Sequence, residues 1–206
     1  MSLSFRPSIA VAAAAPVVLI GGWTIAASQQ PPGYDPVRDT ISALAAIGAT
    51  DRWIMTGALA GLGASYIGTA ARLRGSRPLG RLILGAGGVG TVLVAVFPQP
   101  HEGNSHAHTV AATLAFIALA VWPAFSASKE DAANGLSPLV LKCSAVILLG
   151  LVAWFALETH GSQRGLAERM AAGAESIWPL VIIAYQGRSR SHVSRIGATP
   201  MTAIRG

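Results

Sequence analysis

Six stretches of mostly apolar residues, each close to the length of a membrane-spanning helix, dominate the sequence. They cover approximately residues 8–28, 53–72, 82–97, 108–127, 139–157 and 168–186. A helix needs about 20 mostly apolar residues to cross a bilayer. Short polar joints separate the stretches, and only 12% of the 206 residues are charged. We therefore expect an all-α integral membrane protein in which residues 1–186 form a six-transmembrane-helix bundle.

Lysine and arginine are unevenly distributed over the joints. Eleven of the 15 basic residues lie in the joints that share one side with the chain ends, and the other side has Arg38, Arg52, Arg164 and Arg169. Because cytoplasmic joints are enriched in these residues, both termini are expected in the cytoplasm. The net charge of +6 then reflects this bias and a basic cytoplasmic tail at 187–206, which suits anionic lipids. Nucleic acid is not an expected partner.

The acidic residues and histidines concentrate on the opposite, extracytoplasmic side. With the predicted topology, this side receives four of the five histidines and seven of the nine acidic residues. A binding or catalytic site, if the protein has one, should therefore open to the extracytoplasmic side.

The first outer loop, residues 31–53, has the pattern of a short amphipathic helix. Asp35 followed by Pro36 is typical of a helix N-cap and first helical residue. The apolar positions share one helical face: Val37, Ile41, Leu44 and Gly48. The polar positions lie largely opposite: Arg38, Asp39 and Ser42. This polar face either lines a cavity or is an ordinary solvated surface with a weak charge pair.

Three histidines occur within eight residues of the second outer loop, FPQPHEGNSHAHT (97–109): His101, His106 and His108. Imidazoles bind zinc and similar divalent ions. His106 and His108 would point apart on a helix, but they could converge with His101 in an extended loop. A divalent metal site is one hypothesis, and histidines that contact solvent or lipid headgroups are the other.

Glu175 is the strongest single candidate for a functional residue. It lies seven residues after Glu168, hence on the same helical face and about 10 Å deeper. Ionisable residues at such depth usually face the interior of a bundle. Glu158, at the end of the preceding stretch, is its predicted neighbour. Two carboxyl groups with unequal burial suit acid/base catalysis, whereas an internal hydrogen bond to Arg, Ser or Tyr is the structural alternative.

Glycine-rich segments inside the apolar stretches have a simpler interpretation. GAGGVG (85–90) matches the dinucleotide-binding pattern, but it lacks the strand–turn–helix context that this pattern requires. We interpret it, together with GALAG (57–61), as a seam of small residues between packed helices.

Several segments together resemble a bacterial integral membrane family, domain of unknown function 998, and are similar to its actinobacterial members. They are PGYDPVRDTISALAA, FPQP followed by HTVAATLAF, and GLAERMAAGAESIWPL. The resemblance covers nearly the whole chain and implies a six-helix protein of the bacterial cell (inner) membrane. It points to His108 and to the stretches Tyr34–Ser42 and Glu168–Trp178, without giving them a role.

Three functions fit these features. The first is an enzyme for a lipid-like or isoprenoid-like substrate, with Glu175 and Glu158 as acid and base, assisted by His108 and Asp39. Its substrate contacts would come from Tyr34, Arg38, Ser42, Glu168, Arg169 and Trp178. The others are a non-catalytic lipid-binding or accessory subunit and a small proton-coupled transporter. Convergence of the outer polar residues on one cavity would favour an enzyme or a binding site over a subunit whose histidines contact only solvent.

Overall fold

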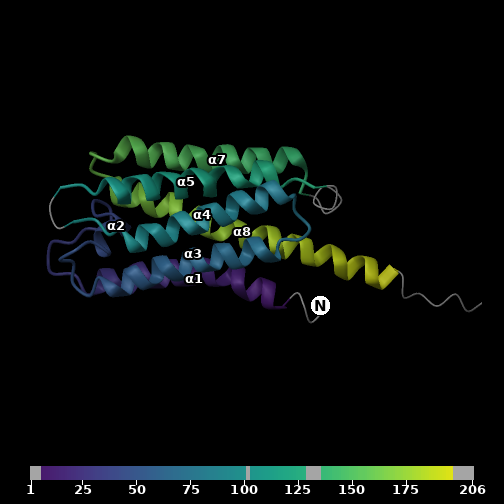
Figure 1. Cartoon of the computed structure of the whole chain (residues 1–206), viewed down its shortest axis with the longest axis horizontal. Coiled ribbons are helices and arrows are strands. Elements are labelled where there is room, and N and C mark those ends of the chain that lie inside the picture. Colours follow the sequence, from purple (N-terminus) through teal and green to yellow (C-terminus); the bar gives the residue numbers. More distant parts are fainter. Residues whose placement is uncertain (1–5, 101–102, 129–135, 197–206) are drawn as a thin grey trace, which may run out of the picture.

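The computed structural model describes residues 6–100, 103–128 and 136–196. These residues form helices and connecting turns, with no strand among them (Figure 1). The helices are α1 (Arg6–Ser28), α2 (Ile41–Leu44), α3 (Trp53–Arg72), α4 (Pro78–Val96), α5 (His106–Ser126), α7 (Pro138–Glu158) and α8 (Arg164–Ile196). The all-α prediction is confirmed.

The long helices pack side by side in a closed ring. Each contacts the next in the order α1, α3, α4, α5, α7 and α8, and α8 returns to α1. α8 also touches α3 and α5, so one of its faces is turned towards the middle of the ring. The short α2 lies at one end of the bundle, whereas α1 begins and α8 ends at the opposite end (Figure 1). This arrangement leaves α2 in position to cover the centre of the ring.

Five of these helices are long and apolar enough to cross a membrane: Ser8–Ser28, Trp53–Arg72, Pro78–Val96, His106–Ser126 and Pro138–Glu158. This supports a multi-pass membrane protein. α8 is not among them, so the predicted number of six spans is not confirmed. Its apolar stretch contains Glu168, Arg169 and Glu175, and the helix continues to Ile196, beyond the predicted limit at residue 186.

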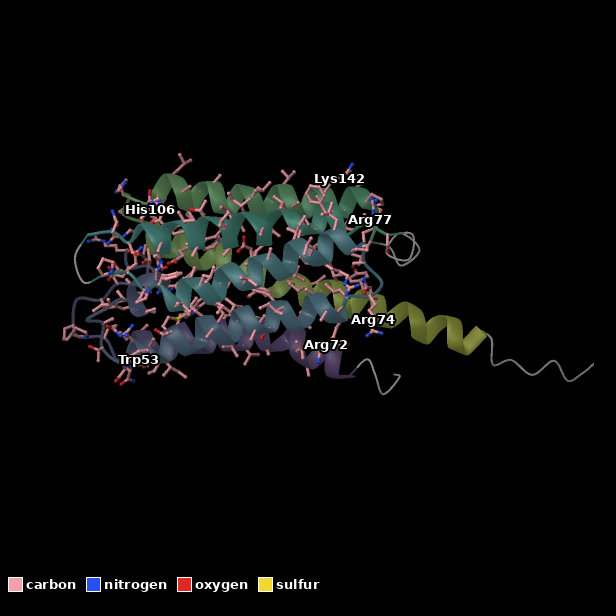
Figure 2. All side chains as sticks on the ribbon, viewed as in Figure 1. Trp53, Arg72, Arg74, Arg77, His106 and Lys142 are labelled. Atoms are coloured by element: carbon pink, nitrogen blue, oxygen red, sulfur yellow. The ribbon has the colours of Figure 1, made fainter. Side chains whose placement is uncertain are left out.

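Large apolar side chains cover the outside of the ring. Val17 on α1 and Leu139 and Val146 on α7 are 69%, 70% and 68% exposed. Apolar surface of this kind suits contact with lipid, because lipid tails are as apolar as these side chains. Basic side chains instead gather at one end of the bundle. Figure 2 shows Arg72, Arg74, Arg77 and Lys142 at one end, and Trp53 and His106 at the other.

Glycines bring the backbones of α3 and α4 into direct contact. A Cβ atom added at Gly88 would lie 2.8 Å from the carbonyl oxygen of Gly63, and one added at Gly63 would lie 2.6 Å from that of Gly88. On the other side of α4, a Cβ at Gly90 would lie 3.1 Å from the backbone of Ala115 in α5. The interpretation of GAGGVG as a packing seam is confirmed. In GALAG it holds for Gly61, where an added Cβ would lie 3.1 Å from Val18 of α1, and it is wrong for Gly57, where nothing lies within 4 Å.

The predicted helix of the first outer loop is shorter and begins later than expected. Asp35 starts a single turn, in which its carbonyl accepts hydrogen bonds from the N–H groups of Arg38 (3.0 Å) and Asp39 (2.6 Å). The helix itself, α2, begins only after Thr40, whose side chain accepts from the Ala43 N–H at 3.1 Å. Asp35 is therefore not the N-cap of this helix.

Two side-chain contacts explain this break. The Asp39 carboxylate accepts from the Asp35 N–H at 2.9 Å, which closes the first turn on itself. The Ile41 N–H then donates to Glu168 of α8 instead of to a preceding turn. The N–H groups of Asp35 and Ile41 thus have side-chain acceptors, so they do not need the backbone acceptors that a single continuous helix would provide. Of the predicted apolar face, Ile41 and Leu44 are buried, whereas Val37 is 41% exposed.

Candidate functional site

A cavity of about 50 Å³ lies inside the ring of helices. This is room for a few water molecules. Its apolar wall comes from α1, α3, α4 and α5, with residues such as Leu19, Leu62 and Phe116. Five of the lining residues have polar side chains: Ser42, Tyr66, Thr91, Glu168 and Glu175. An apolar pocket with a few convergent polar groups is the usual form of a small-molecule site.

Glu175 brings a fully buried and unused polar atom to the described lining of the cavity. Its side chain is 1% exposed, and its Oε1 has no hydrogen-bond partner among the described residues. The described lining contains no Lys, Arg or His that would pair with it. Isolated buried carboxyl groups are costly unless a partner is supplied. Glu175 is therefore the group in this cavity that is best placed to meet a ligand.

Glu168 lines the same cavity but is already engaged. Its Oε2 accepts the hydrogen bond from the Ile41 N–H, and its Oε1 accepts from Ser42 Oγ at 2.9 Å. The side chain is 3% exposed. As the spacing of seven residues predicted, Glu168 and Glu175 share one face of α8. Glu168 thus joins the start of α8 to α2, the element that covers the cavity.

Arg169 fixes the rest of the first outer loop to α8. Its Nη1 donates to the carbonyl oxygens of Pro36 and Asp39, both at 2.7 Å, and to that of Gly165 at 3.0 Å. Its Nη2 donates to the hydroxyl oxygen of Tyr34. Burial raises the pKa of the Tyr34 hydroxyl above its ordinary value, although the positive charge and hydrogen bond of Arg169 act the other way. Tyr34 therefore stays neutral at physiological pH.

The backbone of this loop lies directly on the first turn of α8. The Leu166 N–H donates to the Val37 carbonyl at 3.0 Å, and Arg164 Nε donates to the Arg38 carbonyl at 2.7 Å. A Cβ atom at Gly165 would lie 2.7 Å from the Pro36 carbonyl oxygen. We call residues 34–42 the lid, because Ile41 and Ser42 line the cavity.

The structure does not bring Glu158 to Glu175. Glu158 ends α7, where its Oε2 accepts from the Gln163 N–H at 3.1 Å and its carbonyl accepts from the Gly161 N–H at 2.7 Å. These bonds hold the turn between α7 and α8, and Glu158 is outside the cavity lining. The carboxyl group that shares the cavity with Glu175 is Glu168.

Asp39, Arg38 and Trp178 also lie outside the cavity lining. The side chains of Arg38 and Asp35 are 71% and 45% exposed and 3.6 Å apart, so the solvated charge pair of this loop forms with Asp35 and not within the polar face predicted from the sequence. Asp39 is 3.9 Å from Arg164. Trp178 packs against the hydrophobic core, and its buried Nε1 has no partner among the described residues.

The two described histidines of the second outer loop are separated. His108 is 3% exposed, and its Nδ1 donates to the Phe97 carbonyl at 2.8 Å, which joins α5 to the end of α4. His106 is exposed on another face of α5, and His101 lies outside the described residues. Within residues 6–100, 103–128 and 136–196, no group of three or more His, Cys, Asp or Glu side chains is arranged to hold a metal ion.

The contact of His108 predicts a structural effect. His108→Ala should lower the free energy of unfolding by about 1–3 kcal/mol, because a buried side chain is removed and the Phe97 carbonyl loses its donor. His106→Ala, at an exposed position of the same helix, should change it by less than about 0.5 kcal/mol. Thermal unfolding of the two variants in one detergent measures the difference. Equal effects would contradict a positioning role for His108.

Sequence reasoning missed Tyr66 and Thr91 as lining residues. Tyr66 is 1% exposed in the middle of α3, and Thr91 Oγ1 donates to the Gly87 carbonyl at 2.9 Å. A tyrosine in the middle of an apolar stretch was a usable signal, since a buried hydroxyl usually has a polar partner or a cavity. A threonine was not, because it can satisfy its hydroxyl within its own helix.

Comparison with known proteins gives one match. The model of a family described as "Protein of unknown function (DUF998)" matches residues 12–185, a range that includes the lid and both glutamates of the cavity. No curated protein and no solved structure matches the chain.

Proposed function

Because this chain belongs to the DUF998 family, whose description names no activity, we propose a function from the cavity: a multi-pass membrane enzyme that acts on a lipid-like or isoprenoid-like substrate by acid/base chemistry. The observation that carries the proposal is the presence of two buried glutamates in one apolar cavity, one of them with an oxygen that no described residue satisfies. Apolar walls suit a hydrocarbon chain, and carboxyl groups suit proton transfer at its polar end.

Glu175 is the proposed proton-transferring group. Burying an unpaired charge is costly, so the neutral carboxyl is the favoured state of the empty cavity. A polar substrate group next to Glu175 would exchange a proton with it. Glu168 takes the place that the sequence suggested for Glu158: held by Ile41 and Ser42, it is a fixed second carboxyl group two helical turns away.

Substrate entry requires the lid to move. At about 50 Å³, the cavity with the lid in this position is too small for a lipid-like molecule. Ile41 and Ser42 form part of its wall. Opening would break the hydrogen bonds from the lid to Glu168 and Arg169 and would also withdraw Ile41 from the hydrophobic core. Tyr34, Arg38 and Asp39 would then meet the substrate on its way in, whereas Trp178 would support α8.

The proposal includes the topology expected from the sequence. α8 is the sixth span, both termini are cytoplasmic, and the protein lies in a bacterial cell (inner) membrane. In support, Arg72, Arg74, Arg77 and Lys142 gather at the end of the bundle where α1 begins and α8 ends (Figure 2). The cavity and the lid then face the extracytoplasmic side.

A non-catalytic lipid-binding subunit is the second candidate. It is favoured by the contacts of Glu158, Glu168 and His108, each of which already holds two parts of the fold together. In this case Glu175 alone would contact the ligand, and no bond in it would change.

The test is an unbiased conversion assay. Purified protein is reconstituted with a total lipid extract from bacterial membranes, and the lipids are compared by mass spectrometry before and after incubation. We expect one lipid class to be consumed by the wild type and by Glu158→Gln, and about 10²-fold more slowly by Glu175→Gln. Retention of a lipid without conversion would favour the binding subunit. If no lipid is either retained or converted, both candidates are refuted.

A further inference from the structure

We infer that the cavity selects an amphiphile whose polar end donates hydrogen bonds and has no phosphate, namely a hydroxyl or a primary amine on a hydrocarbon chain. The inference rests on the proposed function, since it names the class of ligand for the same cavity. It follows from which hydrogen-bonding capacity the lining residues leave unused.

The unused capacity in the cavity includes several acceptors, beside the Tyr66 hydroxyl, which can accept as well as donate. Ser42 Oγ donates its proton to Glu168, and Thr91 Oγ1 donates its proton to the Gly87 carbonyl. The oxygens of both hydroxyls can still accept. Glu175 Oε1 has no partner among the described residues, and a carboxyl group accepts hydrogen bonds whether or not it is protonated. A ligand group that donates would therefore be satisfied here.

Groups that bind phosphate are missing from the lining that the structure describes. It contains no Lys, Arg or His. The nearby guanidinium of Arg169 instead points its donors at the lid, to Pro36, Asp39 and Tyr34. The first N–H of α2, that of Ile41, is taken by Glu168. Because phosphate requires such donors and would here meet two carboxyl groups, phospholipid and isoprenoid-diphosphate headgroups do not fit.

The size of the cavity points to a small polar end. With about 50 Å³ and walls that are largely aliphatic, it has room for an amine or hydroxyl group with its first methylene groups, and not for a sugar. Movement of the lid would admit the hydrocarbon chain of the ligand. The donor group of the ligand would then contact Glu175, which lies deeper in the bundle than Glu168 on the same face of α8.

The test uses three water-soluble probes with the same four-carbon chain: n-butylamine, n-butanol and butyl phosphate. Thermal unfolding of the full chain in mild detergent is measured at increasing probe concentration. Binding to the folded state should raise the melting temperature by about 2 °C or more with n-butylamine, n-butanol or both, and not with butyl phosphate. A shift with the amine alone assigns an ammonium ligand, and a shift with the alcohol as well assigns a hydroxyl.

Two variants show whether the effect comes from the cavity. The shift should disappear in Glu175→Gln and persist in Glu158→Gln. An equal shift with butyl phosphate, a shift that survives in Glu175→Gln, or no shift with either donor probe would overturn the inference. If Glu175→Gln does not fold, the comparison of the three probes on the wild type still decides between donor and phosphate. If the donor probes bind but no lipid is converted, the proposed enzyme is refuted and this inference stands. If a phosphate lipid is converted, the enzyme stands and this inference is refuted.

Discussion

Replacing Gly88 by alanine should destabilise the bundle strongly, whereas the same change at Gly57 should leave it unaffected or slightly stabilised. An added Cβ at Gly88 would lie 2.8 Å from the Gly63 carbonyl oxygen and 3.0 Å from the Ile67 nitrogen. Both are backbone atoms, so α3 and α4 would have to move apart. Overpacking of this kind costs about 1–3 kcal/mol. The melting temperature of a chain of this size should then fall by about 2–12 °C.

Gly57→Ala is the matched control, because it adds the same Cβ atom at a position that contacts no other helix. It lies on α3, and an added Cβ would meet nothing within 4 Å. Alanine is a better helix former than glycine, by up to about 1 kcal/mol. The two variants should therefore shift the melting temperature in opposite directions in one detergent. A similar loss in both would contradict the packing explanation, because helix propensity favours alanine at both positions and only Gly88 is in contact with another helix.

The helices themselves could be predicted from the sequence because their main requirement is local. Apolar side chains must cover about 20 consecutive residues before the backbone can cross lipid. The predicted stretch at 53–72 is the range of α3, Trp53–Arg72. α4 begins at Pro78, earlier than the predicted residue 82, because proline is favoured in the first turn and the turn is not part of the apolar stretch.

The first outer loop could not be predicted in the same way, because contacts distant in sequence determine it. Asp35 and Pro36 are a strong local signal for a helix start. Yet Ser42 meets Glu168 across 126 residues of sequence, and Arg169 meets the Pro36 carbonyl across 133. These partners satisfy the loop backbone in another conformation. Nothing in the residues 31–53 alone indicates that α8 supplies them.

The candidate site was predicted in part for the same reason. Glu175 and Glu168 belong to one helix, so their spacing places them on one face without knowledge of the fold. Glu158 and Glu175 belong to two helices that follow each other in the sequence. That order alone did not reveal that the Glu158 side chain bonds to the turn between α7 and α8. Tyr66 meets the cavity only because α3 and α8 both face the middle of the ring.

Removing the Arg169 side chain is expected to free the lid. Arg169→Ala loses the donors to the carbonyls of Pro36 and Asp39 and to the Tyr34 hydroxyl, while the ring of long helices keeps its contacts. Hydrogen bonds from charged groups contribute about 1.5–3 kcal/mol each at most, and these are partly exposed. We expect the free energy of unfolding to fall by about 2–4 kcal/mol. Amide hydrogen exchange in residues 34–45 should rise more than exchange in α3.

Two further variants separate the geometry of this contact from its charge. Arg38→Ala removes a positive charge from the lid itself, but its side chain is 71% exposed, so stability should change by less than about 0.5 kcal/mol. Arg169→Lys keeps the charge but cannot reach three acceptors with a planar fork, so lid exchange should stay high. If Arg169→Lys exchanged as slowly as the wild type, a positive charge at this position would be sufficient to hold the lid. A lid held by charge alone would respond to salt, whereas one held by the Arg169 fork should open chiefly when a ligand competes for the same acceptors.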